Sequence, residues 1–460
     1  SVCRGPQPLN SPPLVLEDVC LADELGELTV DALSPSPAQR QVVLSEESTP
    51  LCRALTAVAL SDVETNLHRK GGWVYFGTGA AFGGHVYERD IAYSALLGLN
   101  TLYPTEVLSS LKLTRELRLA MGFQASRGNV IREIPAPWKI THEVEREHIH
   151  TWGTSSFTRR TDDVVWVWAA WDWLQRHGYP PQTLRWFHDT AVRCWEELYR
   201  YWQDPETGLY FGQASFIDIH HAEPGPGGRL KTTGYPQDWP LRQCVLIHAT
   251  STNVLHFQAL RSMAESATKL GYADEATTWR RRAEALRAAI LQHLRNKDGT
   301  FVYYRGGDGS GGTRREALGT ALAVLSGLVE GDHARRALAG YPVTVRGVPI
   351  FHPFFDFEQA YHNHTAWPFV DAFFCLAWQR AFGHATGSAT VALTARTLIN
   401  GPPTFREVVG FHDGVVDGSH HQLWTAAGFL GAGLRDGWLR PVDAGPAKRL
   451  PEFEESQTPP

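Results

Sequence analysis

Apolar residues recur at helical spacing along most of the chain, beginning at about residue 88. Several of these segments end as helices do: "WLQRHGYPP" closes with a basic turn, Gly178 and two prolines, and "ATKLGYADEA" breaks at Gly271 between two helical patterns. The predicted helices span residues 89–100, 105–121, 161–177, 183–202, 246–271, 273–295, 314–328, 332–339, 359–383, 385–398 and 418–434. About ten to twelve helices, many of them paired, predict an all-α helical toroid or barrel.

Two other helical architectures fit the pattern poorly. No heptad is sustained, which disfavours a coiled coil, and no strict short repeat is visible, which disfavours a simple solenoid. Residues 1–60 are instead rich in Pro and Ser and contain short β-like runs such as "RQVVLS". We therefore expect an irregular or strand-bearing segment at 1–60, packed on a helical barrel at 61–440, with a tail at 441–460.

The loops between the predicted helices are long. Examples are "RGNVIREIPAPWKITHEVEREHIHTWGTSSF", "GQASFIDIHHAEPGPGGRLKTTGYPQDWP" and "NGPPTFREVVGFHDG". Long loops without structure of their own tend to carry function, and a barrel of helix pairs would gather them at one end.

Composition and charge disfavour several classes of partner for the chain. The formal net charge is −6, with no basic patch typical of nucleic-acid binding. No apolar run reaches the roughly 18 residues that would span a membrane, and no signal peptide is visible. The six cysteines are scattered without CxxC spacing, which disfavours a structural zinc site. We expect a cytoplasmic protein, although a secreted chain whose signal had been removed would look the same. The oligomeric state is not indicated.

Tryptophan is unusually frequent, with 16 residues, and several lie beside polar residues or glycines. Flat aromatic faces with a polar edge suit stacking on sugar rings, whereas packing in a core explains any single Trp equally well. The Trp residues in question are Trp73, Trp138, Trp152, Trp239, Trp367 and Trp424.

Four polar stretches lie at the ends of predicted helices. Arg89 and Asp90 open one helix, and Asp162 and Asp163 open another. Acidic residues at these positions can simply cap a helix, but an Arg–Asp pair at a helix mouth can also bind sugar hydroxyls.

The other two stretches contain carboxylates that capping explains less well. Asp218 lies among Phe216, Ile217 and Ile219, and Glu407 is followed by two valines. Glycoside hydrolysis needs two carboxyl groups, one held protonated by apolar surroundings and one ionised. Asp218 fits the acid and Glu407 the base. Several histidines follow these stretches, but no HExxH or compact ligand triad is present, so we expect neither a metal nor a cofactor.

Taken in order, these stretches resemble the six-hairpin glycosidases, which are (α/α)6 barrels, and above all the glucosidase domain of glycogen-debranching enzymes and their bacterial relatives. "ERDIAYSALLGLN", "RRTDDVVWVWAAWDWLQRHG", "GLYFGQASFIDI", "AYHNHTAWPFVDAFF" and "FREVVGFHDG" are similar to segments of that family, over roughly residues 85–430. The resemblance implies a (α/α)6 toroid of helical hairpins.

The resemblance also implies an activity, an inverting exo-acting glycoside hydrolase for a terminal α-linked gluco- or manno-configured sugar. Carried over residue by residue, it makes Asp218 the general acid and Glu407 the general base. The residues that would contact the sugar are Arg89, Asp90, Trp152, Asp163, His362 and Trp367.

The chain departs from the family at places that bear on the substrate. Phe216-Ile217 replaces Trp-Met before the acid, and His364 replaces a glycine. These changes point to a substrate other than glycogen. Three alternatives stay open: a phosphorylase on the same fold, a catalytically silent carbohydrate-binding protein, and a polysaccharide lyase on a related toroid.

Overall fold

The computed structural model describes residues 35, 38–46, 48–70, 72–84, 86–120, 133–134, 161–197, 199–217, 222–224, 230–232, 247–306, 311–344, 346–356, 361–398 and 403–442. Within these ranges no helix is long and apolar enough to cross a membrane.

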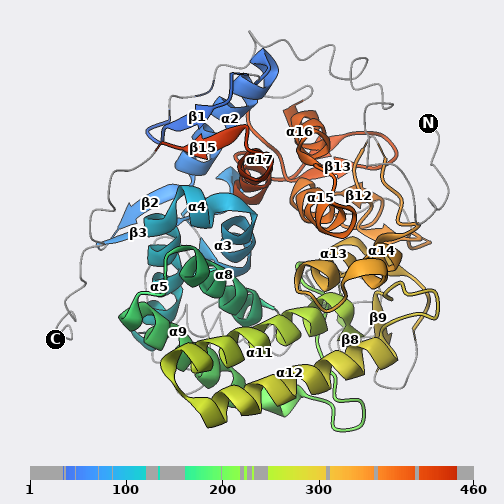
Figure 1. The fold of residues 1–460 in the computed structure, drawn as a ribbon. Helices are drawn as coiled ribbons and strands as arrows, with labels where there is room; N and C mark the ends of the chain where they lie inside the picture. The colour runs from blue at the N-terminus through green and yellow to red at the C-terminus, as the bar shows by residue number, and fades with distance from the viewer. Residues whose placement is uncertain are drawn as a thin grey trace.

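An inner ring of helices surrounds the centre of the molecule (Figure 1). Its members are α3 (Glu88–Ser94), which continues through η4 (Ala95–Leu99) and α4 (Asn100–Leu102), then α8 (Asp162–Arg176), α11 (Thr250–Leu270), α13 (Ala317–Leu325), α15 (Pro368–Phe382) and α17 (Leu423–Asp436). Each contacts the next, and α17 returns to contact α3, so the ring is closed.

An outer helix precedes each inner helix along the chain. The outer helices are α2 (Pro50–Thr65), α5 (Pro104–Ala120), α9 (Pro181–Glu197), α12 (Ala273–His293), α14 (Gly331–Leu338) and α16 (Gly387–Ala395). The burial patterns explain the two layers. In α13, Ala317 to Val324 are all buried, whereas α12 buries one stripe that includes Ala276, Trp279, Ala283 and Leu286. The expected all-α (α/α)6 barrel is confirmed.

Short strands connect the helices, in sheets of two or three strands within the described ranges. Antiparallel pairs join β1 (Val42–Leu44) to β15 (Leu439–Pro441), β2 (Leu67–Lys70) to β3 (Trp73–Phe76), β4 (Val86–Tyr87) to β5 (Glu133–Ile134), β6 (Ala222–Pro224) to β7 (Leu230–Thr232), β8 (Ile247–Ala249) to β9 (Tyr304–Gly306) and β10 (Arg315–Glu316) to β11 (Phe351–His352). The remaining sheet is β12 (Thr365–Ala366), β13 (Val408–Gly410) and β14 (Val416–Asp417), and short 3-10 turns occur at Ala80–Phe82, Tyr199–Trp202 and Arg396–Leu398. β4, β8, β10 and β12 each lead directly into an inner helix, so they border its N-terminal end.

Some helix starts differ from the pattern in the sequence. Helix α2 begins at Pro50, inside the segment expected to be irregular or strand-bearing, with Thr49 accepting a hydrogen bond from Cys52 N (3.1 Å). The expected helix 359–383 begins only at Pro368, because proline is favoured in the first helical turn and the residue before it is extended. The break predicted at Gly271 is confirmed, since this residue ends α11 with a φ of 80°.

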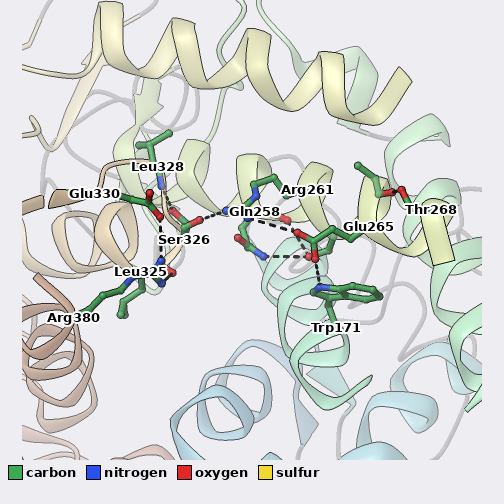
Figure 2. A network of polar contacts seen from close by, with 12 residues as sticks. Trp171, Gln258, Arg261, Glu265, Thr268, Leu325, Ser326, Leu328, Glu330 and Arg380 are labelled. Carbon is green, nitrogen blue, oxygen red and sulfur yellow. Dashed lines mark hydrogen bonds and ion pairs between the residues drawn. The ribbon is translucent and has the colours of Figure 1, made fainter. Parts of the chain in front are cut away.

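The C-terminal ends of the inner helices are held by a polar network (Figure 2). Trp171 on α8 donates to Glu265 on α11 (2.9 Å), and Arg261 on α11 bonds both Glu265 (3.6 Å) and the carbonyl of Ser326 after α13. Arg380 on α15 donates to the carbonyl of Leu325 (2.7 Å). These contacts fix the C-terminal end of the ring, while the opposite end carries the residues discussed next.

Candidate active site

Buried polar residues gather at the N-terminal ends of the inner helices. Each inner helix has at least one within its first turn or immediately before it, and α15, whose first turn contains Asp371, is also preceded by the buried indole of Trp367. These polar residues include Glu88, Arg89, Asp90, Thr161, Asp162, Asp163, Thr250, Ser251, Glu316, Asp371 and Gln422. Such a concentration of buried polar groups is unusual and marks this end of the barrel as the candidate site.

Ser215 links the N-terminal ends of four inner helices. Its hydroxyl lies 2.5 Å from Tyr93 Oη of α3 and 2.5 Å from Thr161 Oγ1 beside α8. Its backbone N–H donates to Ser251 Oγ of α11 (2.9 Å), and that hydroxyl donates to Glu316 Oε2 beside α13 (3.0 Å). The segment that leads to Asp218 is therefore anchored to the ring at Ser215.

Glu316 lies at the end of this network and is completely buried. Burial raises its pKa to about 8, although hydrogen bonds from Ser251 and the backbone oppose the rise. At neutral pH the carboxyl group is therefore mostly protonated.

Asp218 and Trp152 lie outside the described residues. The described chain reaches Ile217, and both Phe216 and Ile217 are 1% exposed. Phe216 has a φ of 58°, which is rare for a bulky side chain. Its ring packs edge-on against His362 and Trp367, with 5.3 Å between centroids in each pair. The backbone that leads to Asp218 is thus held in a strained conformation against an aromatic cluster.

Glu407 is held by donors from two different loops. Tyr361 Oη donates to Glu407 Oε2 (2.6 Å), and Ser419 N donates to the same oxygen (3.2 Å). Gly418, with a φ of 81°, packs so closely that a Cβ there would lie 2.6 Å from Glu407 Cβ. Glu407 is 3% exposed, whereas Tyr361 is 38% exposed, so the carboxylate lies one side chain below the surface.

One aromatic cluster connects the two candidate catalytic segments. The ring of Trp367 contacts both Phe216 (5.3 Å) and Tyr361 (4.8 Å), and Tyr361 bonds Glu407. His362 stacks on Trp367 at 5.1 Å and 7°, and both side chains are buried. Both residues were expected to line the pocket. In the structure they lie beneath Phe216 and Tyr361 and support these two rings.

The acidic residues of α3 and α8 are also brought together. Arg89 Nε lies 3.5 Å from Asp90 Oδ2, with both residues buried at the start of α3. Burial raises the pKa of neighbouring Glu88 well above its usual range, and the charges of Asp162, Asp163 and Asp90 raise it further.

Asp163, expected to contact the sugar, is placed on another side of its helix. It lines a small cavity between α8, α9 and α11 and hydrogen-bonds Tyr199, with His256 beside it. The charge of Asp162 acts both on Tyr199 and on Tyr93, which belongs to the Ser215 network. Among the described residues, no group of three or more His, Cys, Asp or Glu side chains is arranged to hold a metal ion.

Sequence reasoning did not single out Ser215, Ser251, Glu316 or Tyr361. Tyr361 lies in "AYHNHTAW", and Glu316 is the acidic residue that precedes the apolar run "ALGTALAVL". An isolated acid before a wholly buried helix was the available signal for Glu316.

Comparisons with known proteins give matches in structure alone. No family model and no curated protein sequence matches the chain. A rhamnosidase from Klebsiella oxytoca with rhamnose bound superposes with a TM-score of 0.56 at 14% identity, over 87% of this chain and 66% of its own. Neutral trehalase from Saccharomyces cerevisiae gives 0.53 at 12%, over 85% and 80%. A mannosylglycerate hydrolase from Thermus thermophilus in complex with glucose gives 0.57 at 14%, over 81% and 98%.

The chain thus spans 66% of the length of that rhamnosidase and nearly all of the mannosylglycerate hydrolase. These superpositions establish the fold, and the low sequence identities leave the activity to be argued from the site. The chain has the (α/α)6-barrel fold that the six-hairpin glycosidases share.

Proposed function

We propose that the protein is an inverting, exo-acting glycoside hydrolase with Asp218 as general acid and Glu407 as general base. The observation that carries the proposal is the setting of Glu407, a buried carboxylate that two donors orient beneath a half-exposed tyrosine. A base must be held in one orientation to direct a water molecule at the sugar, and this arrangement does so.

The mechanism follows from the two carboxyl groups. Asp218 protonates the glycosidic oxygen as the bond to the leaving group breaks. Glu407 removes a proton from a water that attacks the opposite face of the sugar, so the anomeric configuration inverts. In this class the two groups lie about 6.5–9.5 Å apart, which leaves room for that water.

The structural neighbours support a small glycoside as substrate. These neighbours include a rhamnosidase, a trehalase and a mannosylglycerate hydrolase, and their names suggest small saccharides. We propose an α-linked gluco- or manno-configured sugar, whose hydroxyls the Arg89–Asp90 pair would bind by charge-assisted hydrogen bonds. Trp152 is proposed to stack on the sugar, and His362 and Trp367 to support the pocket from beneath. Asp163, which bonds Tyr199 in a different cavity, is left out of the proposed set.

The test compares wild type with Asp218→Asn and Glu407→Gln on a panel of disaccharides and aryl glycosides. Each variant should lose about 10²–10⁴-fold in kcat, as expected when a general acid or base is removed. NMR of the first-formed product should show the inverted anomer. Glu330→Gln is the matched control, because this carboxylate is exposed and pairs with Arg380 at the opposite end of the barrel.

Four results would contradict the proposal. A retained anomer excludes inversion, and wild-type turnover in Asp218→Asn excludes that acid. Turnover that requires phosphate identifies a phosphorylase. Sugar binding without turnover of any substrate identifies a silent carbohydrate-binding protein.

A further inference from the structure

The segment that carries Glu407 forms a closed loop, residues 403–422, here called the base loop. Gln422 N donates to the carbonyl of Phe405 (3.1 Å) and joins the two ends. Between them, Val408 pairs with Asp417 and Val409 with Val416. The position of Glu407 therefore depends on what holds the two ends of this loop.

Both ends bond one carboxylate on a distant part of the chain. Asp62 lies on the outer helix α2, and its side chain is 0% exposed. Phe405 N donates to Asp62 Oδ2 (2.6 Å), and His421 Nδ1 lies 2.7 Å from Asp62 Oδ1. Asn66, one turn further along, donates to the carbonyl of His421 (2.6 Å). Helix α2 thus holds both ends of the base loop by hydrogen bonds.

Asp62 is costly to bury, which indicates that its contacts matter. Burial raises its pKa to about 6, while the bonds from His421 and Phe405 N lower it again. An apolar residue could attach a loop to α2 without this penalty. A carboxylate, however, can accept two hydrogen bonds of fixed direction at once.

The two bonds lie on either side of the groups that orient Glu407. Phe405 is two residues before Glu407, and His421 is two residues after Ser419, whose N–H bonds the Glu407 carboxylate. His421 also has a φ of 51°, an unusual conformation for a non-glycine residue that its partners must hold in place. A shift at either end would move Glu407 relative to Ser419 and Tyr361.

We infer that Asp62 is a positioning residue that fixes the general base by clamping both ends of the base loop. The inference rests on the proposed role of Glu407. It assigns to an outer helix, remote from the substrate, a direct part in the geometry of catalysis.

The first test replaces Asp62 with Ala and with Asn. Asp62→Ala removes both bonds, and kcat should fall about 100-fold with little change in KM, because a misplacement of about 1 Å costs that much. Asp62→Asn should restore most of kcat. Its oxygen can accept from Phe405 N, and its amide can donate to a neutral His421 Nδ1.

Asp436→Ala is the matched control. Asp436 also links two helices by accepting a backbone N–H, from Gly387 (2.7 Å), but it lies at the C-terminal end of α17. This variant should lose stability and keep kcat. Wild-type kcat in Asp62→Ala, or an equal loss of kcat in Asp436→Ala, would overturn the inference.

Hydrogen–deuterium exchange provides a readout that does not require turnover. Peptides from residues 403–422 should exchange faster in Asp62→Ala and unchanged in Asp436→Ala. If Asp62→Ala exchanges faster but the wild-type protein cleaves no glycoside, the proposed function is wrong, while the role of Asp62 in holding the base loop is supported. Unchanged exchange would defeat the clamp itself.

A second variant covers the case in which Asp62→Ala does not fold. His421 has a side chain 29% exposed, so His421→Ala removes one of the two bonds at modest cost. His421→Ala should lower kcat and speed exchange in the base loop, but each effect should be smaller than that expected for Asp62→Ala, which loses both bonds. Wild-type values for both quantities would contradict the inference.

Discussion

At the residue scale, the bond from Tyr361 to Glu407 gives a direct prediction. Tyr361→Phe removes a donor that orients the carboxylate while keeping the ring contact with Trp367. A hydrogen bond to a charged group contributes about 1.5–3 kcal/mol. If that energy serves to orient the carboxylate, kcat should fall about 10- to 100-fold, together with a lower melting temperature. Tyr272→Phe is the control, because Tyr272 is also 38% exposed. Equal kcat values for the two variants would contradict the assigned role.

Individual residues were predictable where their local surroundings were decisive. Glu407 could be singled out because neither a cap nor a solvated face explains an acid followed by two valines, and it is buried beside β13. The sequence does not show which of the adjacent residues Asp162 and Asp163 bonds Tyr199, because this depends on how α8 is rotated about its axis. Tyr361 and Ser215 act through partners far away in the chain, so no local pattern could identify them.

At the element scale, glycine controls how closely the first and last inner helices approach. A Cβ at Gly431 of α17 would lie 1.6 Å from the carbonyl oxygen of Leu97, and one at Gly98 would lie 3.0 Å from Gly431 Cα. Gly431→Ala should therefore force α17 away from η4 and destabilise the fold by about 3 kcal/mol. Urea unfolding measures this difference. Gly312→Ala, where a Cβ meets no atom closer than 3.9 Å, should change the stability little, and equal effects would refute the steric argument.

Helix existence was easier to predict than helix starts. The inner helices are apolar over most of their surface, so their long apolar segments are easy to recognise in the sequence. Their N-terminal ends are harder to locate, because they carry the polar residues of the site. The run before Pro368 has helical spacing yet contains a turn and β12, because its aromatic residues pack into the site cluster.

At the scale of the whole molecule, buried acids couple stability to pH. Burial raises the pKa values of Glu316 and Asp371 to about 8, far above those of an unfolded chain. Between about pH 4.5 and 8 the folded state therefore binds more protons than the unfolded state, and stability falls as the pH rises. Each group contributes up to about 1.4 kcal/mol per pH unit.

Glu316→Gln should remove one of these contributions and flatten the dependence. Urea unfolding of wild type and variant at several values from pH 5 to 8 measures the two slopes. Glu330→Gln, in which an exposed carboxylate is lost, should keep the wild-type slope. A Glu316→Gln slope as steep as that of wild type would show that Glu316 is ionised in the folded protein.

The architecture as a whole was predictable from the order of the motifs, since their resemblance to six-hairpin glycosidases covers most of the barrel. The individual contacts at the closure were not, because they join residues such as Val42 and Pro441 that are separated by nearly the whole chain. Such contacts leave no mark in local hydrophobic spacing.

This closure also governs when the protein can first work during its synthesis. Helix α17 closes the ring by packing against α2 and α3. The partners of Asp62, Phe405 and His421, are synthesised more than 340 residues after it. While the chain grows on the ribosome, the apolar faces of the earlier inner helices have no partner to complete their burial, which makes such intermediates prone to aggregate. A nascent chain that has not yet released α17 has neither a finished barrel nor a clamped Glu407, so activity should appear only after α17 has left the ribosome.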